Sequence, residues 1–195
     1  MTTTTVGAGS SVAVTSSSGV ITLGATTAGT SLSVTGAGAV SLGTTILGTN
    51  LTVSTAGAIT NTGTLTVPQQ TILTAGAANN ITLDNANNDF NSVQILSANN
   101  VTLVDKNAIN FGWYYGWNGY GAYPSTISGN LNVTAGGDIS QTGYNNGNYA
   151  AISVGGSTTF TANNANAPIN LWMGTNNPFN PCLLYTSRPA AVTYS

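Results

Sequence analysis

The chain has 195 residues, of which 41% are apolar and only 3% are charged, and its formal net charge is −2. Soluble domains usually carry about 25% charged residues, so the hydroxyl and amide groups of Thr, Ser and Asn must hydrate this surface. Disordered chains combine low hydrophobicity with high net charge, and neither property is present here. The two basic residues are too few to neutralise a phosphate backbone, which excludes nucleic-acid binding.

From the N-terminus, apolar residues recur in pairs at alternate positions, as in short strands that bury one face. The early pairs are Val12 and Val14, Ile21 and Leu23, Leu32 and Val34, Val40 and Leu42, and Leu51 and Val53. Val12, Leu32 and Leu51 follow one another at a nearly constant interval, and Ile81 and Val101 are separated by the same interval. The Asn-Gly turns of antiparallel hairpins are scarce. The period therefore predicts an all-β, single-stranded parallel β-helix, a solenoid with about 20 residues per coil.

A longer repeat is superimposed on the coil period. Residues 50–63, NLTVSTAGAITNTG, and residues 130–143, NLNVTAGGDISQTG, are identical at seven of fourteen positions. Residues 65–83 match residues 152–171 in the same way, with one residue inserted. This repeat of roughly eighty residues covers most of the chain and predicts one solenoid over residues 1–180.

The segment 79–103, NNITLDNANNDFNSVQILSANNVTL, together with NLNVTAGGDISQTG and SVGGSTTFTA, resembles the repeat region of bacterial filamentous-haemagglutinin-like adhesins. The resemblance runs from about Val40 to Leu171. It implies a right-handed parallel β-helix at the outer surface of a Gram-negative cell, exported by two-partner secretion through an outer-membrane partner. The first residues lack the basic and apolar regions of a signal peptide, so we expect an internal segment of a longer stalk.

Residues 104–124 depart from the repeat. Val40 precedes Asn50 by ten residues, whereas Val101 precedes Asn130 by twenty-nine, so the second copy contains an insertion of close to one coil. Tryptophan and tyrosine combine a large contact area with a polar edge, so rings in this insertion can stack on sugars or anchor a partner protein. Alternatively, the insertion is an extra coil or a flap whose rings cover apolar surface. The candidate binding residues are Trp113, Tyr114, Tyr115, Trp117, Tyr120 and Tyr123.

Four aspartates, Asp84, Asp89, Asp105 and Asp138, are the only acidic residues. Asp84 and Asp105 are separated by close to one coil and could stack as the acid and base of a polysaccharide-cleaving enzyme. The chain has no His or Glu to complete such a site, and Asp among Asn and Gly is typical of capped corners. We therefore expect no enzyme activity, no cofactor and no metal site. Paired asparagines predict stacked amide ladders at other corners: Asn79 and Asn80, Asn87 and Asn88, Asn99 and Asn100, and Asn163 and Asn164.

The last residues differ from the rest of the chain. Residues 182–187, CLLYTS, resemble the translation of the transposon mosaic end used in sequencing libraries, and they coincide with the end of the repeat pattern. The single Cys and the single Arg, Cys182 and Arg188, lie in this stretch. We interpret residues 181–195 as a non-native tail.

The sequence thus predicts a structural and adhesive segment of a secreted cell-surface adhesin, whose partner is a glycan or a protein on a host or neighbouring cell. Two alternatives stay open. One is a β-helix polysaccharide hydrolase or lyase, which requires clustered acids beside a basic residue. The other is an ice- or surface-binding solenoid, which requires regular outward rows of threonine.

Overall fold

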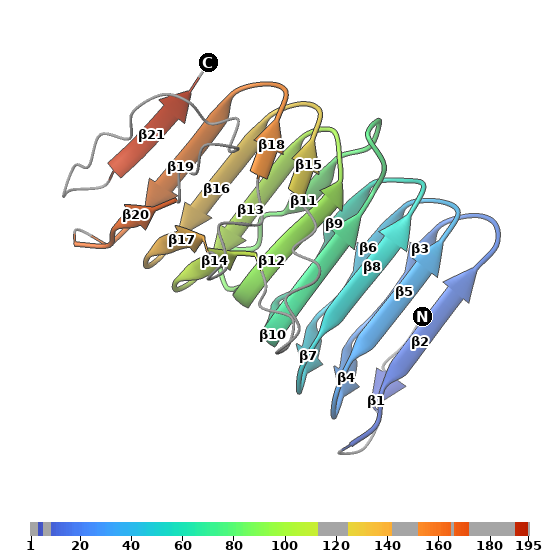
Figure 1. Cartoon of the computed structure of the whole chain (residues 1–195). Coiled ribbons are helices and arrows are strands. Elements are labelled where there is room, and N and C mark those ends of the chain that lie inside the picture. Colours follow the sequence, from blue (N-terminus) through green and yellow to red (C-terminus); the bar gives the residue numbers. More distant parts are fainter. Residues whose placement is uncertain are drawn as a thin grey trace, which may run out of the picture.

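The computed structural model describes residues 4–5, 9–112, 125–141, 152–164, 166–171 and 190–194. Within these residues the chain forms strands joined by short corners and contains no helix, so the described part holds no helix able to cross a membrane. The strands stack side by side along a rod (Figure 1).

Most coils contribute three strands. The first half of the chain contains β1 (Thr4–Thr5), β2 (Val12–Ser16), β3 (Ile21–Thr22), β4 (Thr26–Ala28), β5 (Leu32–Gly36), β6 (Val40–Leu42), β7 (Thr45–Leu47), β8 (Leu51–Thr55), β9 (Ile59–Asn61), β10 (Leu65–Thr74) and β11 (Ile81–Leu83). The second half contains β12 (Asp89–Ser97), β13 (Val101–Asp105), β14 (Ile109–Phe111), β15 (Ser125–Ile127), β16 (Leu131–Ala135), β17 (Ile139–Gln141), β18 (Ile152–Val154), β19 (Thr158–Ala162), β20 (Ile169–Asn170) and β21 (Ala190–Tyr194).

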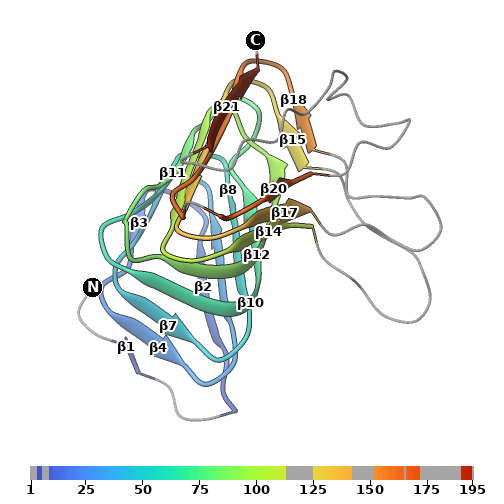
Figure 2. The same cartoon turned by 90° about the vertical axis from the view of Figure 1, so that its left-hand side faces the viewer.

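Three faces surround the core when the rod is viewed along its length (Figure 2). Face 1 consists of β2, β5, β8, the later parts of β10 and β12, β15 and β18. Face 2 consists of β3, β6, β9, β11, β13, β16 and β19. Face 3 consists of β1, β4, β7, the early parts of β10 and β12, β14, β17 and β20. The strands β10 and β12 are long because each continues around the corner from face 3 to face 1.

The predicted parallel β-helix is confirmed. Val12 pairs with Leu32 and Leu32 with Leu51, so the apolar pairs that recur along the sequence are vertical neighbours in successive coils. Ile81 pairs with Val101, as the same interval predicts. Later coils are longer, because the connectors from β14 to β15 and from β17 to β18 add residues. Among the described strands every pairing is parallel except that of β21 with β19.

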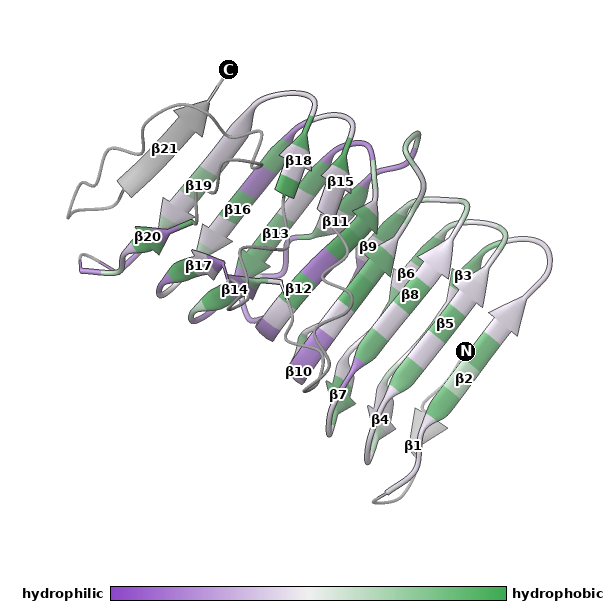
Figure 3. Ribbon diagram, in the orientation of Figure 1, coloured by the Kyte–Doolittle hydropathy of each residue, from purple (hydrophilic) through white to green (hydrophobic). Residues whose placement is uncertain are grey.

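The core is a column of stacked aliphatic side chains. Inward residues of the middle coils, such as Leu51, Ile59 and Leu65, have no exposed surface. Figure 3 shows apolar segments at matching positions on β2, β5 and β8, which is the alternation that the sequence pattern predicts. The outward positions between them carry Thr, Ser and Asn, whose branched or polar side chains suit an extended, hydrated strand.

Glycine is required where successive corners stack most closely. A Cβ atom at Gly43 would lie 2.5 Å from the carbonyl oxygen of Gly24 in the preceding coil, and one at Gly155 would lie 2.5 Å from that of Ser128. Real Cβ contacts are never so short, so a larger residue would force the coils apart. The repeated Gly corners therefore set how closely the coils can stack.

The two copies of the longer repeat occupy different faces. Leu51 of β8 lies on face 1, between Leu32 and Thr71, whereas its equivalent Leu131 in β16 lies on face 2, beside Val101. The faces follow one another in the same order from β2 to β20, so the residues that separate the two copies do not make a whole number of coils. The predicted insertion 104–124 includes the end of β13 and the whole of β14, so part of it is strand of the solenoid, and its residues 113–124 lie outside the described residues.

Candidate functional site

The six predicted binding residues, Trp113, Tyr114, Tyr115, Trp117, Tyr120 and Tyr123, lie outside the described residues. The structure does place the beginning of their segment. Phe111, the first ring of the FGWYYG sequence, is 1% exposed, and its ring meets that of Phe160 edge-on with centroids 6.1 Å apart. This geometry is typical of a packed aromatic pair, so Phe111 belongs to the core.

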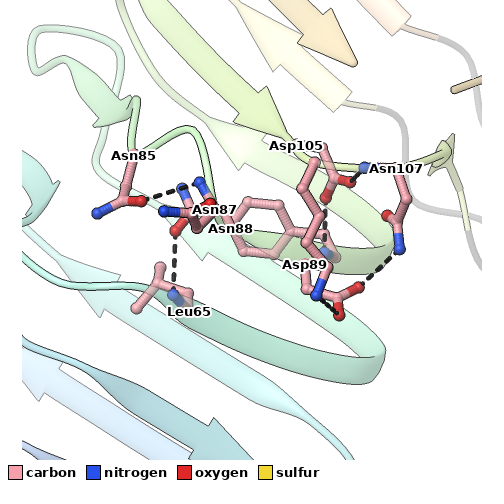
Figure 4. Close-up of polar contacts among 9 residues, drawn as sticks. Leu65, Asn85, Asn87, Asn88, Asp89, Asp105 and Asn107 are labelled. Carbon is pink, nitrogen blue, oxygen red and sulfur yellow. Dashed lines mark hydrogen bonds and ion pairs between the residues drawn. The ribbon is translucent and has the colours of Figure 1, made fainter. Parts of the chain in front are cut away.

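The most polar corner within the described residues lies between faces 2 and 3, where β11 leads to β12 and β13 to β14 (Figure 4). We call it the Asp105 corner, and its side chains are Asn85, Asn87, Asn88, Asp89, Asp105, Lys106 and Asn107. It contains two of the four aspartates and the only lysine of the sequence, so we take it as the candidate functional site within the described residues.

Asp105 is buried at the end of β13, with 2% of its surface exposed. Its Oδ2 atom accepts a hydrogen bond from the Phe90 N–H at 2.6 Å, and its Oδ1 atom accepts one from the Asn107 N–H at 2.8 Å. Burial raises the pKa of Asp105 to about 6, because desolvation of the carboxylate outweighs the two backbone donors that favour its charged form. The side chain thus ties its own turn to the coil below.

Asp89 lies on the outside of the same corner. Its Oδ2 atom is 2.7 Å from Lys106 Nζ, and its Oδ1 atom accepts a hydrogen bond from Asn107 Nδ2 at 3.0 Å. The hydrogen bond from Lys106 holds the pKa of Asp89 below its ordinary value, against a smaller opposing effect of burial. The pKa of Asp89 is therefore lowered and the pKa of Asp105 is raised from the same ordinary value, because Asp89 is paired with a cation and Asp105 is desolvated.

Asn88 joins three coils at this corner and is fully buried. Its Oδ1 atom accepts hydrogen bonds from the Leu65 N–H at 3.0 Å and from Asn61 Nδ2 at 2.9 Å. Its Nδ2 atom donates to the Leu83 carbonyl at 3.2 Å, and its own carbonyl accepts the Lys106 N–H at 2.8 Å. Sequence reasoning identifies Asn88 only as one of a pair, because no local pattern reveals that it points inward.

The hypothetical acid pair of Asp84 and Asp105 does not form. Leu83 pairs with Leu103, so Asp84 is next to Val104 on the outer side, while Asp105 is one residue further on and buried. Each oxygen of the Asp105 carboxylate accepts a hydrogen bond from a backbone N–H. Among the described residues no group of three His, Cys, Asp or Glu side chains is placed to hold a metal ion. The corner is thus built to join coils.

The predicted amide ladder is confirmed for Asn80 and Asn100 at the corner between faces 1 and 2. Asn100 donates from both its N–H and its Nδ2 atom to Asn80 Oδ1, each at 3.1 Å. The ladder continues to Asn130, whose N–H donates to Asn100 Oδ1 at 2.9 Å, and then to Ser157. The sequence analysis did not predict that Asn130 belongs to this ladder. The signal was present, because an Asn directly precedes the first inward residue of three successive face 2 strands.

The three-faced stack of parallel strands defines a repeat protein of the parallel β-helix class. The chain belongs to the family described as repeats of unknown function (DUF5649), whose model matches residues 37–97 and 98–180. Each matched segment contains one copy of the longer repeat, and the match confirms the repeat nature of the chain. No curated protein and no solved structure matches the chain.

Proposed function

We propose that the chain is a structural and adhesive segment of a secreted adhesin of the filamentous-haemagglutinin-like type. It would be exported by two-partner secretion and displayed on the surface of a Gram-negative cell. Its low charge suits a chain that crosses the outer membrane unfolded and then folds coil by coil. Stacked strands, fully buried side chains and amide ladders supply a rigid stalk.

One observation carries the adhesive part of the proposal. The coil period is regular until β14, and there a connector rich in Trp and Tyr separates β14 from β15. A regular coil has no structural need of so many rings, whereas contact surfaces are enriched in these residue types. We therefore assign Trp113, Tyr115 and Trp117, with the other predicted rings, to contact with a glycan or a protein on a host or neighbouring cell. No catalytic role is proposed.

The test uses beads coated with the chain and counts those that attach to cultured epithelial cells and to bacteria. Replacing three rings (Trp113→Ser, Trp117→Ser and Tyr120→Ser) is expected to reduce attachment at least about tenfold, since each lost anchor weakens binding by roughly 2 kcal/mol. A matched control, Thr35→Ser with Thr52→Ser, changes outward residues of face 1 and should attach like the unaltered chain. Equal attachment of both variants contradicts the adhesive role.

A second candidate is the ice- or surface-binding solenoid, which a continuous row on face 2 favours. Outward residues of seven strands pair in register along this face. The row consists of Thr22, Ser41, Thr60, Thr82, Thr102, Asn132 and Thr159. Inhibition of ice recrystallisation that is abolished by Thr60→Lys with Thr102→Lys would support this candidate over the adhesin.

A further inference from the structure

The strand β21 covers the edge of β19, the last described strand of face 2. β19 pairs with β16 on one side and with β21 on the other, over the residue pairs from Thr158 with Tyr194 to Ala162 with Ala190. Figure 1 shows β21 at the end of the rod opposite β2. A sheet edge presents unpaired N–H and C=O groups, which accept an added strand. The edge of β19 is therefore able to dock a strand from outside the regular coils, and β21 fills it from within the chain.

Both ends of the rod carry inward apolar side chains that are incompletely covered. The inward residues Leu32 and Val34 of β5 have no exposed surface. Their partners in β2, Val12 and Val14, are only partly buried. Val154 of β18, at the far end of the same face, is also only partly buried. Removing such apolar surface from water favours the addition of a further coil at either end.

The register of the strands continues from the last coil to the first. One inward column runs along face 2, and each of its residues is the direct partner of the next. The column consists of Ile21, Val40, Ile59, Ile81, Val101, Leu131 and Thr158. Because the faces follow one another in the same order from β2 to β20, a second copy moved along the rod axis sets β2 on β18 and β3 on β19 at the same time.

We propose that the edge of β19 docks the first coil of a second copy of this chain, with β3 parallel to β19 and with β21 as the competitor for that edge. Thr22 of the second copy then lies beside Thr159 and continues the outward row of face 2. The contact is head-to-tail and uses different surfaces on the two copies, so it propagates along the rod instead of closing into a symmetric dimer. The second copy covers faces 1 and 2 together, whereas the described part of the tail pairs with β19 alone. This docking does not rest on the proposed function.

The test places single cysteines on the two surfaces in separate molecules, all in a Cys182→Ser background. Thr22→Cys protein is mixed with Thr159→Cys protein under mild oxidation, because neighbouring strands satisfy disulfide geometry, and the linked dimer is measured on a non-reducing gel. Ala191→Pro with Val192→Pro releases β21, since one of two adjacent N–H groups must face β19 and proline has none. An attached strand acts at an effective concentration on the order of mM, so at about 10 μM protein its release should raise the amount of linked dimer at least about tenfold.

Two controls accompany the mixture. Thr22→Cys mixed with Thr102→Cys should give no linked dimer above background, because Thr102 lies between two neighbouring strands of its own chain. An intramolecular disulfide between cysteines at Thr82 and Thr102 should form with and without the two prolines, because these residues are partners far from the tail.

Three results would overturn the proposal. One is an equal amount of linked dimer with and without the prolines, because β21 would then not compete for the edge. Another is a linked dimer formed by Thr159→Cys protein alone, because β19 would then pair with a second β19. The third is loss of the disulfide between positions 82 and 102 in the proline variant, because β21 would then be required for folding instead of acting as a competitor.

Discussion

The buried carboxyl of Asp105 predicts that the protein becomes more stable as the solution is acidified from pH 7 to pH 4. Its pKa is about 6 in the folded chain and near the ordinary value of 3.8 when unfolded. The folded state thus binds the proton more tightly, and the resulting stabilisation is complete below pH 3.8 and is lost as the pH rises through 6. This difference between the folded and unfolded pKa of Asp105 corresponds to roughly 3 kcal/mol in the free energy of unfolding.

The lowered pKa of Asp89 affects stability mainly below the pH range in which Asp105 acts. Its pKa is lowered by Lys106, so its contribution is present above the ordinary value of 3.8 and is lost only as the pH falls through the lower, folded value. Between pH 4 and pH 6, Asp105 is largely protonated in the folded chain and largely ionised in the unfolded chain, so its effect on stability falls in this interval.

The assay is urea unfolding followed by far-ultraviolet circular dichroism at several pH values between 4 and 7. The unaltered chain should gain up to about 3 kcal/mol over this range, whereas Asp105→Asn should show a flat profile because the titrating group is gone. Asp138→Asn changes an exposed aspartate at another corner and should keep the rise. Stability that is constant or falls from pH 7 to pH 5 in the unaltered chain would refute the reasoning.

Three further substitutions test the corners. Asn88→Ala removes one acceptor and one donor that serve three coils and should lower the free energy of unfolding in urea by about 3 kcal/mol. The control Asn87→Ala changes an exposed side chain and should lower it by under about 0.5 kcal/mol. Equal losses would contradict the bridging role of Asn88. Gly43→Ala should lower stability by about 1–3 kcal/mol through the clash with Gly24, and an unchanged melting temperature would show that the coils can separate freely. Lys106→Met removes an ion pair of partly exposed groups and should change stability by less than about 1 kcal/mol. The same substitution should raise the pKa of Asp89, measured by NMR titration. An unchanged pKa would contradict the pairing of Asp89 with Lys106.

The fold was predictable because every coil of the solenoid has the same strand pattern and nearly the same length. The pairs at Val12, Leu32 and Leu51 gave both the strand period and the vertical neighbours, since side-chain alternation and coil length are properties of the sequence itself. The amide ladder at Asn80 and Asn100 was visible for the same reason, as equivalent residues in successive coils must stack.

Other features depend on the exact register of neighbouring strands, in which one residue decides whether a side chain points inward or outward. Asp105 is the last inward residue of β13, whereas Asp84 follows the inward Leu83 and is exposed, so a sequence spacing close to one coil suggested a pair that the structure separates. The displacement of the second repeat by one face was not predicted, because the sequence does not show that the insertion 104–124 contains the short strand β14.

The central functional claim is that this chain is a segment of a larger secreted adhesin, and a long sequencing read across its genomic locus tests that claim most directly. The account predicts a signal peptide and a secretion domain upstream, further coils of the same repeat downstream, and no CLLYTS sequence after residue 181. A complete short gene that ends at Ser195 and encodes no export signal would contradict both the adhesin assignment and the interpretation of residues 181–195 as a non-native tail.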